Sequence, residues 1–357
     1  MMDDFFELRD RTNMLKIARI LNEDLPEFCR EFFIGMENRT STLTRLNYAY
    51  DLRVFFLYLV QEKSTPCFQM KIKDITLEGL NRLQTSDIER YLSYLSFYNK
   101  QTSVKSVYTQ NGEKGKARKL ASVRAMFRYF FKKGKLSANV AANVETPKIH
   151  DKEIVRLEAN EVSRLLDVVE SGDSLTRKQR AIHDNKTAKR DVALISLLLG
   201  TGIRVSECVG LNNRDINMED NSFVVTRKGG NRVVLYYSDE VKEALSEYLQ
   251  EKEQDPERKD LEPLFLSLQK KRISVRAAEN LVKKYCAIVS PLKKLSPHKM
   301  RSTFGTELYR ETGDIYMVAD VLGHRDVNTT RKHYAAIDEN RRRIASTKIT
   351  LREPENK

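Results

Sequence analysis

The sequence offers few residues that could hold a metal or form a disulfide. Among 357 residues there are four cysteines, five histidines and no tryptophan. The cysteines stand far apart and form no C-x-x-C pair, at Cys29, Cys67, Cys208 and Cys286. This spacing argues against a zinc ribbon and against a disulfide framework. We expect four buried thiols, no metal site and a reducing compartment such as the cytoplasm.

Long apolar runs are also absent. No stretch approaches the roughly 18 consecutive apolar residues that a membrane-spanning helix needs. The N-terminal segment MMDDFFELRD is acidic and lacks the apolar core of a secretory signal. The sequence therefore predicts a cytoplasmic protein without a membrane partner, and its length favours two domains.

Negative charge is scarce where positive charge is dense. The formal net charge is +13, and the stretch from Lys100 to Lys148 carries twelve lysines and arginines against only Glu113 and Glu145. Such a surplus points to a polyanion, most often nucleic acid. We predict DNA contacts from six of these cations: Lys116, Arg118, Lys119, Arg124, Arg128 and Lys132.

Three of these cations form a regular series. Arg124, Arg128 and Lys132 recur every four residues, opposite an apolar stripe at helical spacing. We interpret them as one row of phosphate contacts. The alternative is an ordinary solvated face.

The pattern of apolar residues divides the chain into two parts. Residues 1–146 read as an all-α domain, and 147–156 is a polar segment without periodicity, interpreted as a linker. Residues 157–357 read as a mixed α+β domain. In it the pattern predicts a surface loop, a buried helix, a β-hairpin and two helices, at 172–190, 192–199, 222–237, 240–251 and 275–289.

The histidines concentrate near the C-terminus. Ser296 and Pro297 predict a helix start, which places His298 and Arg301 on one helical face. Gly323 is typical of a helix end in the left-handed conformation, so His324 is expected at a helix C-terminus.

These residues complete a set that suits attack on a phosphodiester. Arginines offer planar, permanently charged forks to the phosphate oxygens, where charge builds up in the transition state. A lysine can protonate the leaving oxygen, a histidine can relay a proton, and a tyrosine can form a covalent ester. In chain order the set is Arg204, Lys228, His298, Arg301, His324 and Tyr334.

Each member alone has an ordinary reading. Arg204 could pair with Glu207 on a helix, Lys228 could lie in a solvated turn, and His324 could be a helix-end cation favoured by the helix dipole. The presence of all six residues together favours the catalytic interpretation.

Four motifs carry a family resemblance. G-T-G-I-R-V-S-E, T-R-K-G-G-N-R, L-S-P-H-K-M-R-S-T-F and V-L-G-H followed by Tyr334 resemble, in order, the motif series of the tyrosine recombinases, which include Xer recombinases and phage or transposon integrases. The resemblance spans roughly residues 30–340. The long segment before Arg190 is most similar to the single-recombinase Xer subfamily called XerS.

The resemblance implies a fold and roles for the first residues of the set. The N-terminal helices would be a core-binding domain and the C-terminal domain the catalytic half of a clamp around double-stranded DNA. Arg204 and Arg301 would bind the scissile phosphate, and Lys228 would protonate the 5′-oxygen.

It implies the remaining roles as well. His298 would act as a general acid and base, His324 would hydrogen-bond the phosphate, and Tyr334 would form a 3′-phosphotyrosyl link. The energy of the broken bond stays in that link, so neither ATP nor a metal or other cofactor is expected.

The resemblance further implies an assembly. Four protomers would exchange strands through a Holliday junction on paired sites, with the tail after Tyr334 docking in trans on a neighbour. Chromosome dimer resolution is the expected role, with an FtsK-type DNA translocase as a further partner.

Two departures and three rival readings remain. Ser302 stands where many relatives have a second histidine, and Tyr334 lies ten residues after His324, where many Xer proteins have nine. Tyr309 and Tyr316 are outside candidates for the nucleophile. The rivals are an integrase of a mobile element, a type IB topoisomerase and an inactive DNA-binding module.

Overall fold

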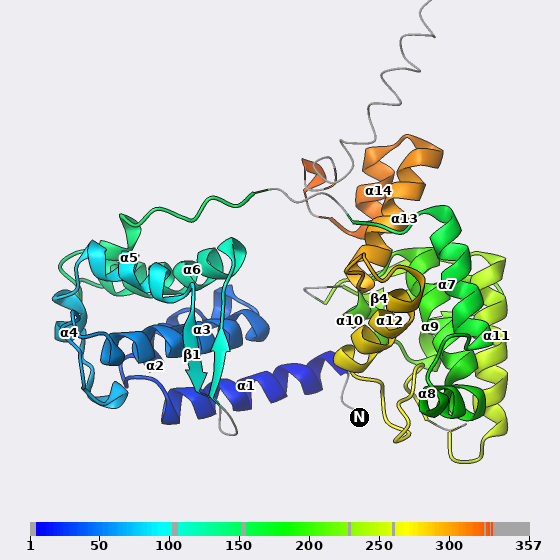
Figure 1. The fold of residues 1–357 in the computed structure, drawn as a ribbon, viewed down its shortest axis with the longest axis horizontal. Helices are drawn as coiled ribbons and strands as arrows, with labels where there is room; N and C mark the ends of the chain where they lie inside the picture. The colour runs from blue at the N-terminus through cyan, green and yellow to red at the C-terminus, as the bar shows by residue number, and fades with distance from the viewer. Residues whose placement is uncertain are drawn as a thin grey trace, which may run out of the picture. The chain divides into compact units, whose positions relative to one another are not determined.

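The chain forms two compact units. The computed structural model describes residues 5–101, 106–150, 155–227, 230–258, 261–324, 326–328 and 330. It divides into units of residues 1–151 and 152–357, shown in Figure 1. The division falls inside the segment that the sequence suggests as a linker, and the domain bounds given above stay a prediction.

The N-terminal unit is built mainly from helices. They are α1 (Phe5–Glu23), α2 (Cys29–Gly35), α3 (Thr42–Gln61), α4 (Leu77–Asn81), α5 (Thr85–Tyr94) and α6 (Glu113–Lys132). Helix α3 begins where Ser41 accepts a hydrogen bond from the backbone N–H of Thr44, at 3.3 Å. The core between helices combines aliphatic side chains with aromatic rings packed edge to face, as in the pairs of Phe55 with Tyr91 and of Phe28 with Phe130.

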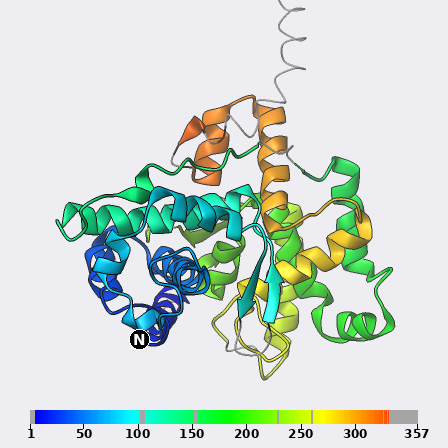
Figure 2. The same cartoon turned by 60° about the vertical axis from the view of Figure 1, so that its left-hand side comes forward.

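One feature of this unit was not predicted. Strands β1 (Tyr98–Gln101) and β2 (Ser106–Thr109) pair antiparallel and run side by side in Figure 2. The all-α expectation therefore holds for the unit except for this hairpin. The sequence YNKQTSVKSVYT is too polar to show a strand pattern.

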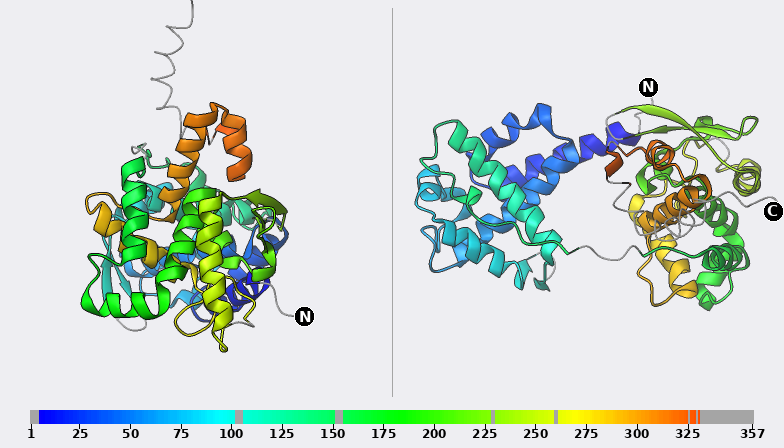
Figure 3. Two further views of the ribbon diagram at one scale, coloured as in Figure 1. Left: turned by 90° about the vertical axis from the view of Figure 1, so that its right-hand side faces the viewer. Right: turned by 90° about the horizontal axis from the view of Figure 1, so that it is seen from above.

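The C-terminal unit combines helices with a small sheet, seen from two further sides in Figure 3. Its helices are α7 (Ala159–Ser171), α8 (Arg177–Ile182), α9 (Ala188–Thr201), α10 (Val205–Gly210), α11 (Asp239–Gln254), α12 (Val275–Val289), α13 (Pro297–Thr312) and α14 (Ile315–Leu322). Its strands β3 (Ile216–Asn217), β4 (Ser222–Thr226) and β5 (Arg232–Tyr236) form an antiparallel sheet in that order. The predicted hairpin and the predicted helices around 192–199, 240–251 and 275–289 are confirmed.

Helix α9 is the centre of this unit. It packs against α7, α11 and α13, and its residues Leu194, Ile195, Leu197 and Leu198 are fully buried. It ends at Gly202, which adopts the left-handed conformation with φ of 63°. The apolar sequence of α9 thus follows from burial on most sides.

The segment 172–190 lies largely at the surface, as predicted, but the prediction that it is a loop is wrong. The segment forms α8, a π-helical turn η4 (His183–Thr187) and the start of α9. Thr176 and Gln179 form a capping box that starts α8. His183 is buried, and its Nε2 lies 2.8 Å from the carbonyl oxygen of Val169. Because the segment is so polar, its sequence showed no apolar helical pattern. Its polar groups form their hydrogen bonds locally.

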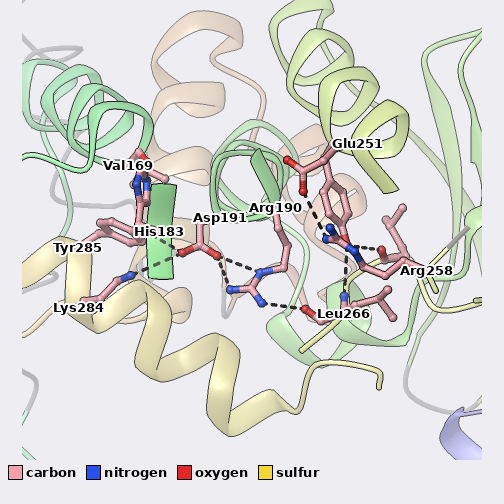
Figure 4. A network of polar contacts seen from close by, with 11 residues as sticks. Val169, His183, Arg190, Asp191, Glu251, Arg258, Leu266, Lys284 and Tyr285 are labelled. Carbon is pink, nitrogen blue, oxygen red and sulfur yellow. Dashed lines mark hydrogen bonds and ion pairs between the residues drawn. The ribbon is translucent and has the colours of Figure 1, made fainter. Parts of the chain in front are cut away.

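A buried carboxylate joins the start of α9 to α12 (Figure 4). Asp191 is 1% exposed. It accepts a hydrogen bond from the hydroxyl of Tyr285 at 2.9 Å and one from Nη2 of Arg190 at 2.6 Å, and Nζ of Lys284 lies 3.6 Å away. Burial, and then the neighbouring charge of Asp191, raise the pKa of Tyr285, so its hydroxyl remains a donor.

Replacing Tyr285 with phenylalanine should destabilise the C-terminal unit by about 1.5–3 kcal/mol, because a hydrogen bond to a buried charged group is removed. Chemical denaturation of the full chain would measure this. Tyr237→Phe is the matched control, since its hydroxyl donates to the neutral carbonyl of Asn217 at 2.9 Å and should cost less. An equal or smaller cost for Tyr285→Phe would contradict the account.

The four cysteines are unpaired and buried, as the sequence predicts. Burial is the main cause that raises the pKa of the Cys286 thiol to about 12, which keeps it uncharged. Within the described parts of the chain, every helix is too short or too polar to cross a membrane.

Candidate active site

The candidate site forms around the C-terminal end of α14. Gly323 ends this helix in the left-handed conformation, with φ of 61°, as the sequence predicts. The last carbonyl groups of a helix have no partner within it and carry partial negative charge, so they attract cations. Here the four consecutive carbonyl oxygens of residues 320–323 all accept hydrogen bonds from arginine side chains.

Arg301 reaches this end from α13. Its side chain is buried, with Nη1 donating to the carbonyl oxygen of Gly202 at 2.7 Å and Nη2 donating to that of Leu322. One guanidinium therefore bridges the C-terminal ends of α9 and α14. The two carbonyl groups are neutral, so they fix the plane of the guanidinium without cancelling its charge.

Arg204 reaches the next carbonyl along the chain. Its Nη2 donates to Gly323 at 3.2 Å and its Nη1 pairs with Glu207 at 2.8 Å. Arg204 is the N-cap of α10, where Glu207 also accepts from its backbone N–H at 2.9 Å. The ion pair with Glu207 that the sequence suggested is present, and it orients an arginine that also contacts α14.

Arg227, at the end of β4, takes the remaining two carbonyls. Its Nη1 donates to Asp320 at 3.1 Å and its Nη2 to Val321 at 2.7 Å. Sequence reasoning missed this residue. The motif T-R-K-G-G-N-R contains it, but a basic residue beside a hairpin turn carries no pattern that distinguishes it from a solvated one.

Two histidines of the predicted set belong to the segments that form these contacts, His298 to the start of α13 and His324 to the end of α14. His324 directly follows Gly323, and its Nδ1 lies 2.7 Å from the hydroxyl of Thr330, which is fully buried. His298 is exposed in the first turn of α13, one turn before Arg301. At Ser302, where many relatives have a second histidine, the hydroxyl donates to the carbonyl of His298 at 3.0 Å.

The predicted set is thus partly assembled in the structure. Arg204 and Arg301 donate to the carbonyls of Gly323 and Leu322, and His324 is the next residue along the chain. His298 shares α13 with Arg301. Lys228 and Tyr334 lie outside the described residues, as does the tail after Tyr334. Among the described residues, no cluster of three or more metal-ligating side chains occurs.

The predicted DNA contacts separate into buried and exposed cations. Asp51 is fully buried on α3, and Nζ of Lys119 and Nη1 of Arg118 lie 2.8 and 2.5 Å from its carboxylate. Lys119 is itself only 7% exposed. Its ammonium neutralises a buried charge, so the structure does not offer it to DNA. Arg118 is half exposed, with a side-chain exposure of 50%.

Two further cations hold the protein together locally. Arg124 donates from Nε to the carbonyl of Ala141 at 3.1 Å and from Nη1 to the hydroxyl of Thr146 at 2.6 Å. Lys116 donates to the hydroxyl of Ser96 at 2.6 Å. Arg124 therefore fastens the segment after α6, and the predicted row of three cations leaves two that are exposed, Arg128 and Lys132.

Replacing Arg128 and Lys132 together with alanine should weaken binding to any DNA sequence. The slope of log affinity against log salt should flatten by about 0.9 for each phosphate that is no longer neutralised. Fluorescence anisotropy across a salt series would measure the slope. Arg124→Ala, on the same helix, is the control. It should mainly lower the free energy of unfolding and change the salt slope little. An unchanged slope in the double variant would mean that these two cations only face solvent.

Comparison with known proteins agrees with this chemistry. The sequence model of the phage integrase family matches residues 155–341. The tyrosine recombinase XerC of Caldanaerobacter subterraneus subsp. tengcongensis is 32% identical over 94% of this chain and 88% of its own length. The tyrosine recombinase XerS of Lactococcus lactis subsp. cremoris is 27% identical over 92% of this chain and 97% of its own.

Solved structures share the fold. The XerH site-specific recombinase, bound to a palindromic difH substrate after cleavage, matches with a TM-score of 0.64 and 19% identity over 95% of this chain and 89% of that one. A lambda integrase tetramer bound to a Holliday junction matches with a TM-score of 0.59 and 16% identity over 86% and 76%. The family match over residues 155–341 and the relative that is 32% identical over 94% of this chain place the chain in the phage integrase family, as a tyrosine-type site-specific DNA recombinase of the Xer kind.

Proposed function

We propose that this protein resolves chromosome dimers by cutting and rejoining DNA at paired sites through a 3′-phosphotyrosyl link to Tyr334. The observation that carries the chemical part is the convergence of Arg204 and Arg301 on the adjacent carbonyls of Gly323 and Leu322, directly before His324. Arg204 and Arg301 come from distant parts of the sequence, so their meeting at one helix end supports a common ligand. A phosphate that gains charge on its equatorial oxygens suits that position.

Side chains of this protein accept and supply the protons in the proposed steps. The hydroxyl oxygen of Tyr334 attacks phosphorus and loses its proton, with His298 as the base. The bond from phosphorus to the 5′-oxygen breaks, and Lys228 protonates that oxygen. Ligation runs the same steps in reverse, with a 5′-hydroxyl as the nucleophile. The guanidiniums of Arg204 and Arg301 are oriented before substrate arrives, so little reorganisation is needed in the transition state.

Assembly is the second part of the proposal. The lambda integrase neighbour is a tetramer on a Holliday junction, and four copies of this chain would exchange strands on two sites in the same way. The tail after Tyr334 would dock in trans on a neighbour and connect the four active sites. An FtsK-type translocase in the cytoplasm would bring the two sites together.

The role in dimer resolution is supported by XerC and XerS relatives that align over nearly the whole chain. Sequencing the genomic DNA captured by Tyr334→Phe protein tests it. One chromosomal site, two copies of which are resolved on a plasmid by the unchanged protein, is the expected result. Capture of the two ends of a mobile element would instead identify an integrase. Relaxation of supercoils without exchange would identify a topoisomerase.

A further inference from the structure

Arg227 connects the β4–β5 hairpin to the end of α14. Its backbone N–H donates to the carbonyl of Asn231 at 2.8 Å, and its own carbonyl accepts from the N–H of Gly230 at 3.0 Å. These bonds close the base of the hairpin turn. Its guanidinium meanwhile spans the carbonyls of Asp320 and Val321 at 3.1 and 2.7 Å. Arg227 thus holds the hairpin turn through its backbone and the end of α14 through its side chain.

The contact is close on the helix side. The guanidinium of Arg227 lies against Gly323, where an added Cβ would overlap it. The positive φ of Gly323, 61°, independently favours glycine there. Gly323 is also the residue whose carbonyl accepts from Arg204 at 3.2 Å. Gly323 therefore contacts both Arg227, which holds the hairpin turn, and Arg204 of the candidate site.

We propose that Arg227 is a positioning residue for the transfer of the proton to the leaving oxygen. It precedes Lys228 in the chain, so anchoring Arg227 fixes the point from which the lysine extends relative to Arg204 and Arg301. This inference rests on the proposed function, because it takes Lys228 as the acid. A general acid contributes about 10²–10⁴ in rate only when it is held within reach of the oxygen.

A different role for Arg227 would be that of a third cation on the phosphate. The contacts of its two Nη atoms with neutral backbone carbonyls resemble those of Arg301, so a substitution that keeps the charge is needed to separate the two roles. A lysine at this position keeps the positive charge but cannot form the planar two-carbonyl contact. Arg227→Lys therefore separates positioning from charge.

The experiment uses the full chain and a nicked suicide duplex carrying the captured recombination site. The scissile phosphate carries either oxygen or sulfur at the bridging 5′ position, and sulfur leaves without being protonated. On oxygen, Arg227→Ala and Arg227→Lys should both cleave about 10–100-fold more slowly than the unchanged protein, since a small misplacement of a catalytic group costs that much. On sulfur, both should return close to the unchanged rate, with DNA affinity retained.

Two further variants make the outcome decisive. Arg232→Ala changes an exposed arginine of the same hairpin, paired with Asp215 at 3.7 Å, and should leave both rates unchanged. Lys228→Ala should be slow on oxygen and rescued by sulfur. If Lys228→Ala is rescued but Arg227→Ala is slow on both substrates or fast on both, the positioning role is wrong while the proposed acid stands. Full activity of Arg227→Lys on oxygen would also overturn it. If sulfur fails to rescue Lys228→Ala, the proposed acid is wrong and the role of Arg227 falls with it.

Discussion

Tyr334→Phe protein should bind its DNA site with unchanged affinity and cleave it at no measurable rate. The substitution removes one hydroxyl group, and that oxygen is the atom proposed to attack phosphorus. No other step can replace it, because strand exchange can begin only after this oxygen has formed its bond to phosphorus. Denaturing gels of a nicked suicide substrate would measure cleavage, and gel shifts would measure binding.

The tyrosines on the neighbouring helices provide the controls. Tyr309 on α13 is 8% exposed and Tyr316 on α14 is 71% exposed. Burial makes Tyr309 a residue of the small core between α13 and α14, whereas Tyr316 is open to solvent. Tyr316→Phe should cleave like the unchanged protein. Residual cleavage by Tyr334→Phe that disappears when Tyr316→Phe is added would move the nucleophile to α14.

Arg301→Ala should reduce both activity and stability. Its guanidinium bridges the buried carbonyls of Gly202 and Leu322, and each carbonyl left without a partner costs about 1–3 kcal/mol. Cleavage should fall by about 10²–10³-fold or more, because an oriented charge on the phosphate is removed. Cleavage would be measured at a temperature where circular dichroism shows the variant to be folded.

Arg204→Ala distinguishes the two effects. Arg204 is 38% exposed in its side chain and donates one hydrogen bond to the end of α14, at Gly323. Its removal should slow cleavage to a similar degree but lower the unfolding temperature less than the removal of Arg301 does. Equal stability of Arg301→Ala and the unchanged protein would show that the bridge between α9 and α14 does not hold the helices together. Normal cleavage by either folded variant would exclude that arginine from the phosphate site.

Much of the fold and part of the site follow from local sequence rules. The apolar run of α9, the strand pattern on both sides of the 228–231 turn and the Gly323 helix end each depend on neighbouring residues, so one sequence suffices to predict them. The meeting of Arg204 and Arg301 on adjacent carbonyls depends on tertiary packing. The motif resemblance implied a shared ligand, but the carbonyl contacts of the two guanidiniums could not be read from spacing.

Charge patterns predicted less than apolar patterns did. Lys119 and Arg128 both occur in the same basic stretch, yet one neutralises the buried Asp51 and the other faces solvent. The difference arises because Asp51, on α3, lies 68 residues before Lys119 in the chain, so no local pattern shows the pairing. Arg227 was missed for the same reason, since its partners are backbone carbonyls of a distant helix.

The central claim is that Tyr334 becomes covalently joined to a 3′-phosphate of DNA. Its most direct test is to trap the unchanged full chain on a nicked suicide substrate, digest the adduct with protease and nuclease, and locate the attached nucleotide by mass spectrometry. We expect a single modified peptide, with a 3′-phosphonucleotide on the oxygen of Tyr334. Attachment at any other residue, or linkage through a 5′-phosphate, would contradict it.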